Sequence, residues 1–105
     1  AAQGAMADFT GTVKGKVIDT NTGEPVEYAN IVFYRMRDST IVTGGITNEK
    51  GEFVIERVPL GRFYGEVKFI GYNSTHLEPF VMSPRQPEVI LGEIKLAQAS
   101  ENLEG

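Results

Sequence analysis

His76 is the only histidine in this chain of 105 residues, which also contains no cysteine. Covalent or acid–base catalysis requires a nucleophile, a base within hydrogen-bond reach and a third group that orients the base. A single imidazole without a thiol leaves no convincing nucleophile–base pair, so we interpret His76 as a surface residue. The sequence therefore predicts no catalytic residues, and the lack of cysteine excludes disulfides and thiolate metal sites.

Four side chains with oxygen donors occur in segments that turn signals mark as loops: Asp19, Glu24, Asn48 and Glu49. Oxygen donors of this kind are the ligands that calcium prefers. The four residues lack the dense acidic spacing of a calcium-binding loop, and Asp and Asn side chains commonly cap turns by bonding nearby backbone N–H groups. We therefore favour turn capping and expect neither a metal nor a cofactor.

Five cationic residues are candidates for contact with an acidic partner: Arg35, Arg37, Arg57, Arg62 and Lys68. Glu56 and Glu66 are interspersed among them, which favours ordinary cross-strand charge pairing over a continuous basic patch. The net charge of −4 argues against nucleic acid as the main partner, because phosphate binding requires a basic surface. The sequence contains no apolar run of about 18 residues, so it predicts no membrane-spanning helix.

A row of apolar side chains, formed by Val32, Tyr34 and Met36, is predicted on the outward face of one strand. The core face of the same strand carries Ala29, Ile31 and Phe33, because successive side chains of a strand point to opposite faces. An exposed apolar row can mark a docking surface, whereas the alternative is that an adjacent loop covers it. We take this row as the candidate interaction face.

The elements that position these residues are short strands separated by turn signals. Alternating patterns predict strands over residues 11–19, 29–37, 40–47, 52–55, 63–69 and 89–96, and residues 73–83 are expected to be extended and irregular. No segment shows helical periodicity with caps. The sequence therefore predicts an all-β sandwich of about seven strands with essentially no helix.

Glycine and proline mark the predicted turns and corners of this sandwich. The structural turn residues are Gly23, Pro25, Gly51, Pro59, Gly61 and Gly71. Gly51 is expected to have a positive φ in a tight turn, and Pro59 with Gly61 should send the chain across to a new strand. For domain organisation, we expect residues 1–10 to be a leader or expression scar, 11–96 the sandwich, and 97–105 a linker toward a following domain.

Six separated blocks of sequence occur in the order found in a known family: GKVID (residues 15–19), GEPV (23–26), ANI (29–31), GITNEKGEF (45–53), PLG (59–61) and FIGY (69–72). Together they resemble the carboxypeptidase regulatory-like domain, which implies a seven-stranded, Greek-key, transthyretin-like (prealbumin-like) sandwich. Gly65 departs from the family pattern, which usually has an aliphatic residue there. Its lack of a side chain leaves a gap in the inward row of Phe63, Val67 and Phe69, which a neighbour must fill or a bulge must absorb.

The resemblance also suggests a host protein. Residues 94–105 and the FIGY block are similar to N-terminal extensions of TonB-dependent outer-membrane receptors of Bacteroidetes. This implies a non-enzymatic periplasmic module in nutrient uptake, at the periplasmic side of the outer membrane in the cell envelope. Its implied partners are the plug and barrel of its own receptor, with a TonB-type energising protein or a surface lipoprotein as further candidates.

Other readings of the resemblance stay open. The chain could instead be an accessory domain of a metallocarboxypeptidase or of a secreted glycan-acting enzyme, or a small carbohydrate-binding module. The transthyretin-like hydrolases of this fold use several histidines and an arginine, a set that one histidine cannot supply. Asp38-Ser39-Thr40 is similar to the short O-glycosylation motif of Bacteroidetes envelope proteins, which makes Ser39 a candidate glycosylation site.

Overall fold

The computed structural model describes residues 9–99, which form seven strands. Their bounds are β1 Thr10–Asp19, β2 Asn30–Arg35, β3 Ile41–Ile46, β4 Glu52–Pro59, β5 Gly61–Lys68, β6 Thr75–Met82 and β7 Glu88–Leu96. The described residues form no helix, and so none that is long and apolar enough to cross a membrane. The predicted all-β class and the expected number of strands are confirmed.

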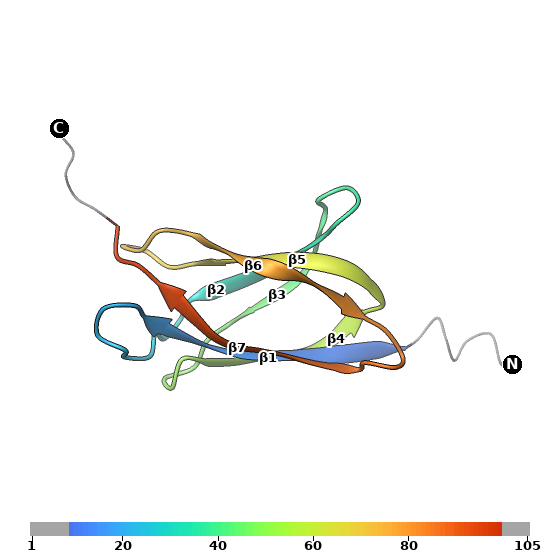
Figure 1. Cartoon of the computed structure of the whole chain (residues 1–105), viewed down its shortest axis with the longest axis horizontal. Helices are drawn as coiled ribbons and strands as arrows, with labels where there is room; N and C mark the ends of the chain where they lie inside the picture. Colours follow the sequence, from blue (N-terminus) through green and yellow to red (C-terminus); the bar gives the residue numbers. More distant parts are fainter. Residues whose placement is uncertain (1–8, 100–105) are drawn as a thin grey trace, which may run out of the picture.

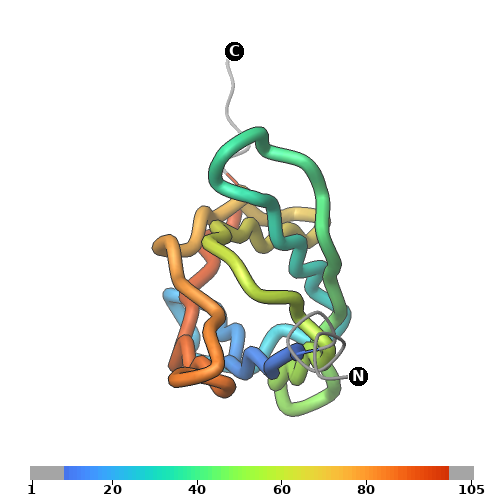
Figure 2. Tube along the Cα trace, turned by 90° about the vertical axis from the view of Figure 1, so that its right-hand side faces the viewer, coloured from blue at the N-terminus to red at the C-terminus, as the bar shows by residue number. Residues whose placement is uncertain are grey.

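The strands form two sheets packed face to face, as Figures 1 and 2 show. One sheet has the order β4-β1-β7 and the other the order β3-β2-β5-β6. The β1–β7 pair is parallel, whereas the other neighbours are antiparallel. The sheets enclose one core in which Phe33, Phe63 and Val13 are completely buried.

The inward face predicted for residues 29–37 is confirmed by burial, and alternation also identifies the buried residues of β4 and β7. Ala29, Ile31 and Phe33 of the second strand region are buried, as are Phe53 and Ile55 of β4. The same holds for the inward residues of β7, Ile94 and Leu96. Alternation alone therefore located most of the core, since one face of each sheet is covered by the other sheet.

The predicted corner between β4 and β5 is also confirmed. Pro59 ends β4 in the three-stranded sheet, and Gly61 begins β5 in the four-stranded sheet, so the chain changes sheets across this short connection. At the tight turn before β4, Gly51 has the expected positive φ of 74°. A Cβ added there would lie 2.5 Å from the carbonyl oxygen of Val17, so both the backbone conformation and a close approach require glycine.

The expectation that residues 73–83 are irregular is wrong, because they contain the regular strand β6. Pro79 lies inside β6, which is an edge strand, and proline is tolerated there because it needs no ladder hydrogen bond on the open side. The register slips beside it: Phe63 pairs with Phe80, but Gly65 pairs with Leu77. This β-bulge absorbs the proline and explains why the alternation was hidden.

The same bulge resolves the predicted gap at Gly65. A Cβ at this position would lie 2.8 Å from Cδ1 of Leu77 and 3.0 Å from Cδ1 of Phe33. These two side chains fill the space in front of Gly65, and a larger residue would displace them. Both expected solutions, a neighbour and a bulge, therefore occur together.

The ordered sandwich extends slightly beyond its predicted limits. Thr10 already pairs with Pro59 at the start of β1. The segment after β7 is bonded to the turn after β5. Asn73 N–H donates to the carbonyl of Ala97, and Ala99 N–H donates to the carbonyl of Gly71 (both 2.9 Å). Residues 97–99 are thus paired with the 71–73 segment. The predicted leader and linker otherwise fall on residues 1–8 and 100–105, which lie outside the described residues, and stay predictions.

Candidate functional site

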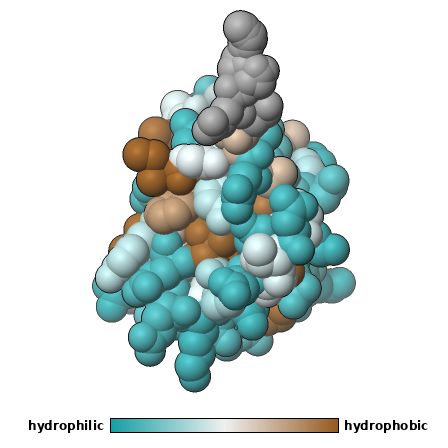
Figure 3. Space-filling model, turned by 90° about the vertical axis from the view of Figure 1, so that its left-hand side faces the viewer, coloured by the Kyte–Doolittle hydropathy of each residue, from teal (hydrophilic) through white to brown (hydrophobic). Residues whose placement is uncertain are grey.

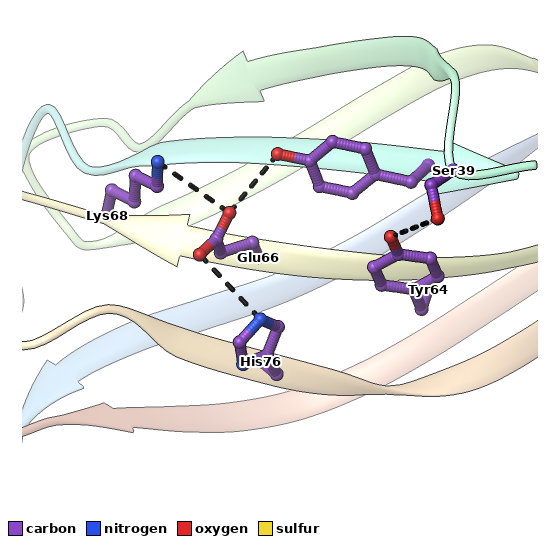
Figure 4. A network of polar contacts seen from close by, with 6 residues as sticks. Ser39, Tyr64, Glu66, Lys68 and His76 are labelled. Carbon is purple, nitrogen blue, oxygen red and sulfur yellow. Dashed lines mark hydrogen bonds and ion pairs between the residues drawn. The ribbon is translucent and has the colours of Figure 1, made fainter. Parts of the chain in front are cut away.

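The outer face of the four-stranded sheet carries the network of polar side chains drawn in Figure 4. Glu66 on β5 lies at its centre and accepts a hydrogen bond of 3.2 Å from the Tyr34 hydroxyl. Lys68 Nζ and His76 Nε2 each lie 3.8 Å from the Glu66 carboxylate. The His76 side chain is 72% exposed, as expected for a surface residue. Lys68 contacts a glutamate of its own strand β5, whereas His76 contacts it from the neighbouring strand β6. Among residues 9–99, no side-chain hydrogen bond joins the imidazole to a hydroxyl that it could activate.

Tyr34 and Tyr64 stand side by side on this outer face, on neighbouring strands β2 and β5. Their rings are stacked, with centroids 5.0 Å apart and planes inclined by 21°. The Tyr64 hydroxyl donates a 3.0 Å hydrogen bond to Ser39 Oγ in the turn after β2. Burial, together with the bond to Glu66, raises the pKa of Tyr34, so its hydroxyl remains a donor at neutral pH.

The predicted apolar row lies along the same face but differs in exposure along its length. Val32 and Tyr34 are half-buried among their neighbours, whereas Met36, which follows the end of β2, is 42% exposed. Ser39 is exposed in the turn between β2 and β3 and has a positive φ of 60°. The roles of the row in docking and of Ser39 in glycosylation stay predictions.

The five predicted cationic residues do not form one patch. Arg35, Arg37 and Arg62 line one cavity of about 430 Å³, together with Met36 and Gly61. Lys68 instead belongs to the Glu66 network, and Arg57 does not line this cavity. Lys68 is therefore paired with a glutamate of its own strand and not across strands, whereas three arginines gather at one cavity, as in the patch that was the less favoured alternative.

The predicted turn-capping roles are confirmed for Asp19 and Asn48. The Asn48 side-chain oxygen accepts from the backbone N–H groups of Lys50 and Glu52 (both 2.9 Å). Asp19 Oδ1 accepts from the N–H groups of Asn21 and Thr22 at 2.7 and 3.0 Å. Backbone amides thus bond to these oxygens, as turn capping requires.

Asp19 has a second role that the sequence did not indicate. Its Oδ2 atom accepts hydrogen bonds from the Tyr72 hydroxyl (2.7 Å) and from Gln98 Nε2 (3.0 Å). The residue is only 4% exposed, and the four donors, led by Tyr72, hold the pKa of its carboxyl well below the usual range. Asp19 thereby ties together the end of β1, the turn after β5 and the segment after β7.

An apolar patch lies at this same end of the sandwich, which Figure 3 views directly. Ile70 is 88% exposed at the tip of the turn after β5, and Tyr28, which has a positive φ of 69°, is also exposed. Both residues line a cavity of about 440 Å³ with Phe69 and Tyr72. A large aromatic side chain in a strained backbone conformation is uncommon and occurs mostly at functional positions.

With the geometry described, comparison with known proteins defines the class of the chain. The fold is that of the transthyretin-like sandwiches: 5-hydroxyisourate hydrolase of Klebsiella pneumoniae has 18% identity and a TM-score of 0.60, over 88% of this chain and 96% of the hydrolase. BcpA, the major pilin subunit of Bacillus cereus, has 18% identity and a TM-score of 0.67, over 86% of this chain and 30% of the pilin. At such identity these likenesses establish the fold alone.

The family follows from the sequence itself. The model of the carboxypeptidase regulatory-like domain matches residues 12–97, and the chain belongs to this family. Bacillopeptidase F of Bacillus subtilis is 35% identical over 102 residues, an alignment that covers 78% of this chain and 7% of that protein. The chain thus spans only a small part of the length of the curated relative that it matches.

Proposed function

We propose that this chain is a non-catalytic interaction module within a longer protein of the cell envelope. The observation that carries this proposal is the use made of its one histidine: the exposed His76 contacts Glu66, as Figure 4 shows, and no side-chain hydrogen bond among residues 9–99 joins its ring to a hydroxyl nucleophile. The similarity to a short part of Bacillopeptidase F, and to 30% of a pilin subunit, supports the role of one domain among several.

The specific host that we propose is a TonB-dependent outer-membrane receptor, with the module on the periplasmic side of the membrane. The supporting observations are the resemblance of the FIGY block (residues 69–72) and the geometry around it. Gly71 and Tyr72 bond to Ala99 and, through Asp19, to Gln98. The block that resembles these receptor extensions is thus the one that holds residues 98 and 99 against the sandwich.

A second candidate function is that of an accessory domain in a secreted peptidase. The observation that favours it is the 35% identity with Bacillopeptidase F, which is named as a peptidase. In that case the module would assist folding or contact with the substrate of a neighbouring catalytic domain. The encoded sequence that follows residue 105 separates the candidates, since only a receptor contains a plug and a barrel.

The test of the receptor proposal is deletion of residues 10–99 from the full-length host gene. We expect the receptor to remain in isolated outer membranes at normal abundance while growth on its cognate nutrient is impaired. The matched control carries Lys50→Gln, an exposed turn residue, and should grow normally. Unchanged growth at unchanged abundance would refute a transport role, and a host gene without a barrel would leave the peptidase-accessory candidate.

A further inference from the structure

The cavity at the end of β2 and the start of β5 is unusual because three of its five lining residues are arginines: Arg35, Arg37 and Arg62. The chain as a whole carries a net charge of −4, so this cluster is opposite in sign to the rest of the molecule. In Figure 2 the connection between β2 and β3, which carries Arg37, projects beyond the body of the sandwich. The cavity therefore lies at an accessible end of the four-stranded sheet.

The frame that holds the arginines is well defined. The Arg35 guanidinium carbon lies 5.6 Å from the ring centroid of Phe63, which is completely buried, so a cation–π contact anchors this side chain. Met36 N–H donates a 3.0 Å hydrogen bond to the carbonyl of Arg62, which ties the segment after β2 to β5. Gly61 has a φ of 143°, and a Cβ there would lie 3.4 Å from Arg35 Nη1. Part of the site is thus preorganised.

The charge of this cluster is largely uncompensated within the described part of the chain. The three ion pairs found among residues 9–99 involve Lys14, Lys68 and His76, and none involves these arginines. One carboxylate, that of Asp38, interacts with two of these arginines. Its pKa is lowered first by hydrogen bonds from Thr40 and to a lesser degree by the charges of Arg37 and Arg35. Arg35 and Arg37 thus act on one carboxylate that already accepts two hydrogen bonds from Thr40, and Arg62 is not among the groups that lower its pKa.

We propose that Arg35, Arg37 and Arg62 form a binding site for a pair of carboxylate groups carried by an extended segment of a partner protein. A guanidinium group presents a planar fork of donors that matches a carboxylate with two parallel hydrogen bonds. A cavity of about 430 Å³ accommodates two such side chains. The exposed Met36 in its wall adds an apolar contact and joins the site to the row of Tyr34 and Val32, along which the segment would continue.

The biological meaning of this binding site rests on the proposed role of the chain as an interaction module. The binding experiment does not depend on that role. Binding is measured on the 105-residue chain alone, so a negative result here leaves the deletion experiment untouched, and the reverse also holds. The probe is a capped pentapeptide with two glutamates separated by one leucine, since alternate residues of an extended segment point to the same side. Its matched control replaces both glutamates with glutamine, and inorganic phosphate is the small-anion control.

The readout is a titration followed by amide chemical shifts. We expect the glutamate peptide to shift residues 35–37 and 61–62 in a saturable manner, the glutamine peptide to have little effect, and binding to weaken as salt is raised. The double variant Arg37→Gln/Arg62→Gln, which leaves the Arg35–Phe63 contact in place, should weaken binding about tenfold or more. Lys50→Gln removes one positive charge outside the cavity lining and should bind normally.

Three results would overturn the proposal. Equal binding by the double variant and Lys50→Gln would move the site elsewhere, and equal binding of both peptides would remove the role of the carboxylates. Saturable binding of phosphate without binding of the glutamate peptide would identify a small-anion site and refute the partner segment. Identical amide spectra of the variant and the parent away from the cavity show that loss of binding is not loss of fold.

Discussion

The two ends of the sandwich differ in whether their charged side chains are paired within the fold. At the end where the chain leaves, Asp19 is buried and receives four hydrogen bonds from neutral donors. At the other end, Arg35, Arg37 and Arg62 line an open cavity and make no ion pair within residues 9–99. A charge whose partners come from its own fold stabilises that fold, whereas charges left without partners are available to another molecule.

Replacement of Asp19 should have the largest effect on stability. In Asp19→Ala the N–H groups of Asn21 and Thr22, the Tyr72 hydroxyl and the Gln98 amide all lose their acceptor. We expect the melting temperature of the isolated chain to fall by about 10 °C. Glu24→Ala removes an exposed carboxylate from the same turn and should change it little. Equal effects of the two variants would contradict the role of Asp19.

The dependence of the free energy of unfolding on pH is a second test of the role of Asp19. The folded-state pKa of Asp19 is lowered, so the unfolded chain binds the proton more tightly, and the stabilisation is present above the unfolded pKa of about 3.9. It is lost as the pH falls below that value toward the folded pKa. Unfolding by urea between pH 5 and pH 2 should therefore show a steeper loss of stability in the parent than in Asp19→Ala. Parallel curves would mean that other carboxylates dominate.

Gly51, at the turn before β4, should be the next most sensitive position. Gly51→Val places a β-branched residue at positive φ and should cost roughly 1 kcal/mol or more. Gly51→Asn separates two causes, because asparagine tolerates this φ but still brings a Cβ against the Val17 carbonyl. A smaller loss for asparagine in urea unfolding identifies the backbone conformation as the cause, and an equal loss identifies the close approach. An unchanged stability in Gly51→Val would contradict both.

These features also show what a sequence can predict. Gly51, Pro59 and Gly61 act within a few residues of themselves, and alternation is a local pattern, so the turn, the corner and the core faces were predictable. Strand β6 was missed because Pro79 and its bulge break the alternation. The Asp19 site could not be inferred, since Tyr72 and Gln98 are 53 and 79 residues away along the chain.

The arginine cluster also could not be inferred from the sequence, because its residues come from separate parts of the chain. Arg35 and Arg62 meet only because β2 and β5 are antiparallel neighbours, with Arg35 paired to Phe63. The order of residues gives no indication of that pairing, so a contiguous patch and dispersed charge pairs were both compatible with the sequence. The fold brings Arg35, Arg37 and Arg62 together at one cavity and places Lys68 beside Glu66 of its own strand.

Substitution of the arginines that line the cavity should change the free energy of unfolding very little. Arg37 and Arg62 are exposed, and substitutions at exposed sites without structural roles usually change stability by no more than about 0.5 kcal/mol. We therefore expect Arg37→Gln/Arg62→Gln to unfold in urea at nearly the same midpoint as the parent. A gain in stability would indicate that the three cations repel one another, which would strengthen the contrast with Asp19. A loss comparable to that of Asp19→Ala would abolish it.

The smallest expected effect concerns His76, which lies on the outer face of the four-stranded sheet. We expect the chain to show no turnover of 5-hydroxyisourate, despite its likeness to the Klebsiella enzyme, nor of peptides, because a lone exposed imidazole beside Glu66 has no nucleophile to activate. His76→Ala should be indistinguishable from the parent in both assays and nearly so in stability, since its contact with Glu66 is long and exposed. The informative result is the opposite one. Turnover that is abolished by His76→Ala would show that this exposed imidazole takes part in catalysis, and the proposal of a non-catalytic module would have to be abandoned.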